Sequence, residues 1–171
     1  MNTYDLTVPQ LKKTLKNLDN WLGAATAYAE KKPFPVDHLA HARLAPDQFA
    51  LVRQVQSACD NAKFIAGRLT GKEWPAHPDT ETTFEQLRAR IASVQGFLDT
   101  FKPDDFKDSS ERKITLPWTE GKWMSGADYL IQFALPNFYF HINMAYAILR
   151  HNGVELGKRD YIGGMPLHAP S

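Results

Sequence analysis

GADYLIQFALPNFYFHINMAYAILRHN, residues 126–152, is the stretch that decides the fold. It has the length of a long helix and is apolar nearly all round, which is typical of a helix enclosed by other helices. Polar residues such as Asn137 and His141 interrupt it too often for a membrane-spanning helix. Pro136 lacks a backbone donor and predicts a kink. We therefore predict a buried, kinked helix that Gly153 ends in the left-handed conformation.

Three other segments have the spacing expected of helices that would enclose it. Their apolar residues recur in alternating steps of three and four, over about residues 7–31, 46–70 and 80–101. The three apolar seams are Val8, Leu11, Leu15, Leu18, Leu22, Ala25 and Ala29; Val52, Val55, Cys59, Ala62, Ala66 and Leu69; and Phe84, Leu87, Ile91, Val94, Leu98 and Phe101. Each segment can therefore bury one face against the last helix.

Local sequence signals predict where these helices begin and end. Thr7 followed by Gln10, and Thr82 followed by Glu85, have the form of N-terminal capping pairs. Gly71 is well placed to stop the second helix in the left-handed conformation.

Residues 104–124 break the helical pattern before the last helix. Apolar and polar residues alternate from Ile114 to Trp118, and Glu120-Gly121 is a plausible turn. We predict a long, partly extended or hairpin-like crossover there. The fold class is therefore all-α: one antiparallel four-helix bundle over residues 1–171, with a surface tail from 153 to 171.

Composition excludes several functional classes. The 171 residues fit one ordinary domain, and the net charge of +1 without a charge block argues against nucleic-acid binding. Cys59 is the only cysteine, so no intrachain disulfide can form, and its place in an apolar seam predicts a core residue rather than a nucleophile. The first residues carry no basic-then-apolar signal, so we expect a cytoplasmic protein without a membrane partner.

His141 is the one polar residue that stands out as a candidate site residue. It shares a helix face with Asn137, one turn away, and a buried imidazole must find hydrogen-bond partners or a metal. Gln56, on the flank of the second seam, is its expected partner across the bundle. The residues leave two readings open: a satisfied core histidine, or a ligand-binding pocket formed by His141, Asn137 and Gln56.

Two segments carry a resemblance to a known family. RLAPDQFALVRQVQSACDNAK, residues 43–63, and FALPNFYFHINMAYAILRHNGVELGKRDYIGG, residues 133–164, resemble an uncharacterised bacterial domain family within the DinB-like superfamily. The resemblance implies a four-helix bundle with a long crossover. It also implies a divalent metal held by one histidine from the second helix and a His-x-x-x-His pair from the last. Some members of the superfamily are metal-dependent thiol transferases.

This chain departs from the metal-binding pattern that the resemblance implies. His141 matches the first histidine of the pair, but Ala145 occupies the second position and Gln56 stands near the second-helix ligand. Because catalytic zinc normally has three protein ligands, we expect a degenerate metal site. No cofactor is predicted, and a divalent metal is an open alternative that the missing ligands argue against.

Three functions follow as hypotheses. The first is a non-metal bundle with a small-ligand pocket around His141, in which that imidazole is the acid-base or ligand residue. The second is a metal-dependent transferase or hydrolase that uses Asp60 as a second ligand beside His141. The third is a non-catalytic, partner-binding homodimer whose contact surface is the tail and residues 118–124.

Overall fold

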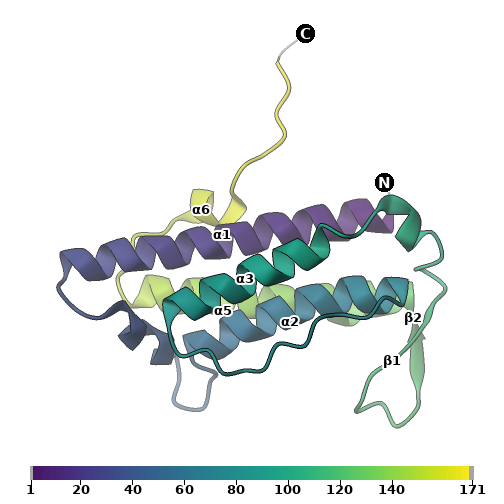
Figure 1. Cartoon of the computed structure of the whole chain (residues 1–171), viewed down its shortest axis with the longest axis horizontal. Helices are drawn as coiled ribbons and strands as arrows, with labels where there is room; N and C mark the ends of the chain where they lie inside the picture. The colour runs from purple at the N-terminus through teal and green to yellow at the C-terminus, as the bar shows by residue number, and fades with distance from the viewer. Residues whose placement is uncertain (1, 170–171) are drawn as a thin grey trace.

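A computed structural model describes residues 2–169 and confirms an all-α bundle (Figure 1). Its four long helices are α1 (Thr3–Lys31), α2 (Leu51–Thr70), α3 (Phe84–Leu98) and α5 (Leu135–His151). The shorter elements are η1 (Val36–His41), η2 (Pro103–Phe106), β1 (Lys113–Thr115), β2 (Trp123–Ser125), α4 (Gly126–Asp128), η3 (Tyr129–Ala134) and α6 (Lys158–Ile162). None of the helices in the described part is long and apolar enough to cross a membrane.

The order of helix directions differs from a simple up-and-down bundle. Figure 1 shows α2 and α3 running the same way, opposite to α1 and α5. Residues 71–83 therefore travel back along α2 before α3 begins. Residues 99–125 are partly extended, as predicted, and contain the antiparallel β1–β2 hairpin. They do not cross the bundle, however, because they join helix ends that lie at the same end of the molecule (Figure 1).

Capping interactions explain why the helices begin where they do. α1 begins at Thr3 because the side chains of Asn2 and Asp5 form a reciprocal capping box. The predicted cap at Thr7 is not used, and its hydroxyl instead donates to the carbonyl of Thr3 inside the helix. α3 begins at Phe84, capped by Thr83.

The second helix begins later than predicted and ends as predicted. It starts at Leu51, whose backbone N–H donates to the Ala42 carbonyl at 2.9 Å. It ends at Gly71, whose φ of 78° is the left-handed conformation expected of a C-terminal glycine.

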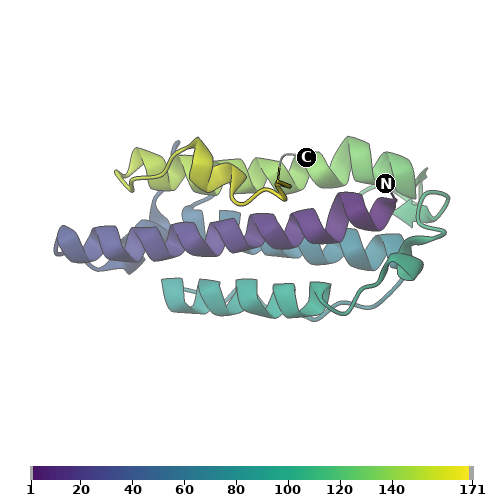
Figure 2. The ribbon, with the colours of Figure 1, turned by 90° about the horizontal axis from the view of Figure 1, so that it is seen from above.

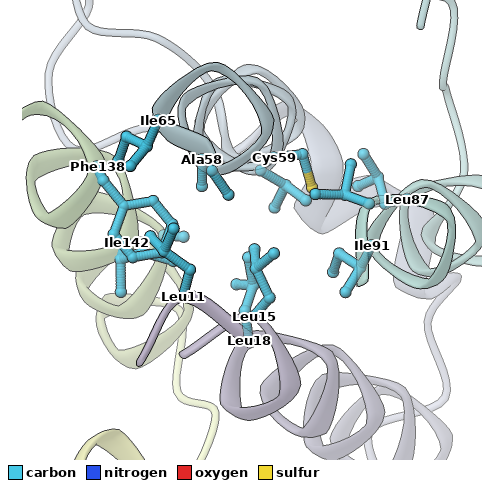
Figure 3. Close-up of a cluster of buried hydrophobic side chains, with 14 of the residues drawn as sticks. Leu11, Leu15, Leu18, Ala58, Cys59, Ile65, Leu87, Ile91, Phe138 and Ile142 are labelled. Carbon is cyan, nitrogen blue, oxygen red and sulfur yellow. The ribbon is translucent and has the colours of Figure 1, made fainter. Parts of the chain in front are cut away.

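The apolar seams meet in one continuous core (Figure 3). Leucines of α1 lie at its centre, between Phe138 and Ile142 of α5 on one side and Ile91 of α3 on the other. Cys59 is fully buried within this core, as its place in the seam predicts. Burial raises the pKa of its thiol to about 12, so the thiolate that would act as a nucleophile does not form near neutral pH.

The last helix is continuous from Gly126, but it contains a π-helical segment. α4, η3 and α5 follow one another without a break, and the wider turn of η3 comes just before Pro136. A π-helical turn accommodates a residue that cannot donate its own backbone hydrogen bond. Gly153 follows α5 with φ of 92°, in the left-handed conformation predicted for it.

The tail is held on the bundle more firmly than a loose surface segment would be. Val154 is fully buried, and α6 packs on α1 (Figure 2). The Trp21 indole donates to the Asp160 carbonyl at 3.1 Å, and the Asn17 amide donates to the Tyr161 carbonyl at 2.9 Å. α6 therefore belongs to the folded domain.

Candidate functional site

His141 lies at the contact between α2 and α5 with a defined hydrogen-bond partner. Its side chain is 8% exposed, and its Nδ1 atom lies 2.8 Å from the Oε1 atom of Gln54. The Gln54 amide nitrogen donates to the Phe49 carbonyl at 3.1 Å. A carbonyl can only accept, so this bond fixes which end of the amide faces the imidazole.

These two bonds determine the tautomer of His141. The Oε1 atom of Gln54 is an acceptor, so Nδ1 of the imidazole must carry the hydrogen. The neutral ring therefore presents the lone pair of Nε2, which has no hydrogen-bond partner among residues 2–169. A histidine whose outer nitrogen is an acceptor, held by a bond at the other nitrogen, is the arrangement that general bases and ligand-binding histidines share.

The electrostatic surroundings keep this imidazole neutral. Burial, followed by the positive charge of Arg53, lowers the pKa of His141 below its ordinary value. Phe140 has its ring centroid 5.3 Å from that of His141, and the ring of Phe49 lies 5.7 Å from the guanidinium carbon of Arg53. Both phenylalanines are about half exposed, at 49% and 53%. The aromatic ring beside the imidazole is therefore partly open to solvent.

Asn137 makes a second polar contact across the same helix pair. Its amide donates to the Oδ1 atom of Asn61 at 2.7 Å. α2 therefore contributes Gln54 and Asn61, which are two helical turns apart, and α5 contributes His141 and Asn137, which are one turn apart. These pairs connect two helices whose remaining contacts are mainly apolar.

Gln56 does not join His141, contrary to the expected grouping. Its amide instead donates to Glu81 at 2.9 Å, on the side of α2 that faces α3. Sequence reasoning missed Gln54 because it treated α2 as having one apolar seam. Gln54, Ala58, Asn61 and Ile65 form a second seam at helical spacing, and this one faces α5.

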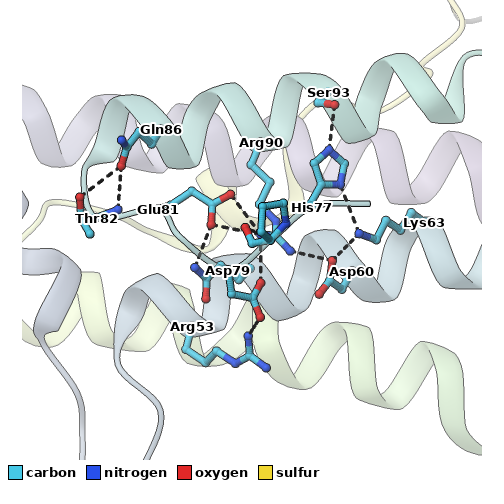
Figure 4. Close-up of polar contacts among 12 residues, drawn as sticks. Arg53, Asp60, Lys63, His77, Asp79, Glu81, Thr82, Gln86, Arg90 and Ser93 are labelled. Carbon is cyan, nitrogen blue, oxygen red and sulfur yellow. Dashed lines mark hydrogen bonds and ion pairs between the residues drawn. The ribbon is translucent and has the colours of Figure 1, made fainter. Parts of the chain in front are cut away.

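Asp60 belongs to a buried ion-pair cluster instead of a metal site (Figure 4). It accepts from Arg90 at 2.7 Å and pairs with Lys63 at 2.8 Å. The side chain of Arg90 is 1% exposed and also binds Glu81. Burial alone would raise the pKa of Glu81, but hydrogen bonds from its own backbone, Gln56 and Arg90 lower it below its ordinary value. The cluster fastens the 71–83 segment between α2 and α3.

His141 has no ready set of metal ligands around it among residues 2–169. Across the part of the chain that the structure describes, no group of three or more His, Cys, Asp or Glu side chains is placed to hold an ion. The two neighbouring positions that would have to supply ligands are Gln54 and Ala145, and an amide and a methyl group are poor ligands for zinc.

Comparison with known proteins finds a family of unknown function and a similar solved structure. The family described as "Domain of unknown function (DUF1993)" matches residues 3–162. A crystal structure of a DinB family member protein from Shewanella denitrificans is 51% identical, with a TM-score of 0.95. That match covers 98% of this chain and 95% of the other. No curated protein matches the chain.

Proposed function

The chain belongs to the DUF1993 family, with the DinB-like fold that its sequence predicts, and we propose that it binds a small molecule at His141 without a resident metal. The observation that carries the proposal is the hydrogen-bond chain from the Phe49 carbonyl through Gln54 to Nδ1 of the imidazole. It leaves the Nε2 lone pair without a donor among residues 2–169.

The chemistry of the site defines the ligand that it would accept. A neutral Nε2 atom accepts a hydrogen bond from a hydroxyl or amine, or takes its proton. The half-exposed ring of Phe140 beside the imidazole offers contact to an apolar group next to that donor. We therefore expect an uncharged ligand with a hydrogen-bond donor next to an apolar ring or chain.

Nuclear magnetic resonance of the imidazole nitrogens tests the proposal. In the free protein, the nitrogen shifts of His141 should show hydrogen on Nδ1 and a bare Nε2. Benzyl alcohol is a suitable probe because it joins a hydroxyl donor to an aromatic ring. Millimolar probe should shift the Nε2 resonance, and His141→Leu should abolish saturable binding.

His38→Leu is the matched control, because His38 lies in η1 and not at the α2–α5 contact. It should leave binding unchanged. Hydrogen on Nε2 in the free protein, or identical probe binding by the wild type and His141→Leu, would reject the proposed site.

A further inference from the structure

A second candidate site lies at the opposite end of α2. An open pocket of about 500 Å³ lies between the last turn of α2, the segment that follows it, and β1. Figure 1 shows this end of the bundle, where the hairpin projects from the helices. Gln54 and Gly67 are thirteen positions apart on one helix, or about 20 Å at 1.5 Å per residue. The cavity is therefore separate from the His141 site.

Two glycines give this cavity its shape. A Cβ atom on Gly67 would lie 2.3 Å from the Cε3 atom of Trp74, so the indole rests directly on the helix backbone. A Cβ atom on Gly71 would lie 2.7 Å from a guanidinium nitrogen of Arg112. The helix thus brings an aromatic face and a cation against its own backbone, and larger residues would exclude both.

Positive charge is concentrated in the lining. Four cationic side chains and one carboxylate line the cavity, so the formal charge of the lining is +3. The cations are Arg68, Lys72, Arg112 and Lys113, and the carboxylate is Glu73. The whole chain carries only +1. The rest of the chain therefore has a net charge of −2, so the lining is a local concentration of positive charge, and such a surface attracts anions.

Most of these cations contact neutral oxygen atoms or aromatic rings and not carboxylates. Arg112 donates to the carbonyls of Leu69 and Thr70 at 3.1 and 3.0 Å, so it caps the end of α2. Arg68 donates to the Tyr129 hydroxyl, and the Lys113 ammonium lies 4.6 Å from the centroid of the Trp123 ring on β2. Within residues 2–169, Lys72 alone of the four forms an ion pair, with Asp105.

We propose that this cationic pocket binds a small organic anion with a flat ring. The phosphate or carboxylate of the ligand would lie against Arg68 and Lys113, and its ring would lie on Trp74, which is 39% exposed. The volume suits such a ligand, because small-molecule sites usually occupy about 300–1,000 Å³. Beneath the ligand, Arg112 would stabilise the C-terminal end of α2 at Gly71 through its bonds to the Leu69 and Thr70 carbonyls.

Calorimetry with three probes tests this assignment. Phenyl phosphate carries both the anion and the ring, inorganic phosphate carries only the anion, and phenol carries only the ring. Phenyl phosphate should bind at least about fivefold more tightly than either fragment, since each offers one of the two contacts. Its affinity should fall as salt is raised, because the pocket is partly exposed.

Two variants and one control locate the binding. Lys113→Gln should weaken phenyl phosphate binding about fivefold or more, and Trp74→Leu should reduce it to the level of inorganic phosphate. Lys13→Gln removes a cation from α1 and should change nothing. The melting temperature of each variant establishes that it is folded.

Two results would overturn the proposal. One is that folded Lys113→Gln and Trp74→Leu bind phenyl phosphate as tightly as the Lys13→Gln control does. The other is wild-type protein that binds none of the probes at millimolar concentration.

Discussion

Replacing Gly67 with alanine has two opposing effects on stability, and the size of each is known. In an ordinary helix interior, replacing glycine with alanine raises the free energy of unfolding by about 1 kcal/mol. Here the added methyl would lie 2.3 Å from Trp74 and 3.0 Å from the carbonyl oxygen of Lys72. Ordinary carbon contacts are about 3.5–4.0 Å, so the indole must move by more than about 1 Å. Overpacking of this kind costs about 1–3 kcal/mol. We therefore expect Gly67→Ala to lower the free energy of unfolding by about 1 kcal/mol.

Gly23 provides the matched control. It lies in the middle of α1, and its nearest neighbour would be a flexible Arg88 nitrogen at 4.0 Å. Gly23→Ala should therefore stabilise by about 1 kcal/mol. The two variants should differ by about 2 kcal/mol in urea unfolding followed by circular dichroism, and by about 4–8 °C in Tm for a chain of this size. Equal stabilisation by both substitutions would refute the contact between Trp74 and α2.

Three further outcomes are expected. The pKa of His141 is lower in the folded chain than the value of about 6.5 usual for histidine, so the unfolded chain binds more protons as the pH falls. Stability should thus be fully present above about pH 6.5 and decline below it, and Tm measured from pH 7.5 to 5.0 should depend less on pH in His141→Gln. Arg90→Met should cost about 1.5–3 kcal/mol because it removes the charged hydrogen bonds that Asp60 and Glu81 receive from a buried guanidinium, whereas Arg88→Met, which breaks an exposed pair, should cost less than about 1 kcal/mol in the same urea titration. Cys59 should react with a thiol reagent only at the rate of global unfolding, and faster labelling in native buffer would contradict its burial.

Local patterns in the sequence were sufficient to predict the helices. The steps of three and four along Leu11, Leu15 and Leu18 gave the buried face of α1, because helical periodicity is set by the backbone alone. Gly71 and Gly153 were predicted as helix ends because a glycine adopts positive φ without steric cost. The burial of His141 followed in the same way, from an apolar helix with few polar interruptions.

The partner of His141 depended on tertiary structure. Gln54 and Gln56 are separated by about 200° around α2, so they face different neighbours, and either amide could in principle have met an imidazole. Rotation of α2 about its axis directs Gln54 to α5 and Gln56 to Glu81. That rotation results from packing against three helices at once, and the two seams of α2 do not show by themselves which helix each one meets.

The two largest polar features are likewise products of chain topology. Because α2 and α3 are parallel, residues 71–83 must return along the bundle, and this return brings Glu81 onto Arg90. The hairpin places Arg112 against Gly71, although the two residues are far apart in the sequence. The sequence by itself determined which residues are helical and buried. Only the tertiary structure decided which polar groups meet, because such contacts depend on helix direction and rotation rather than on local periodicity.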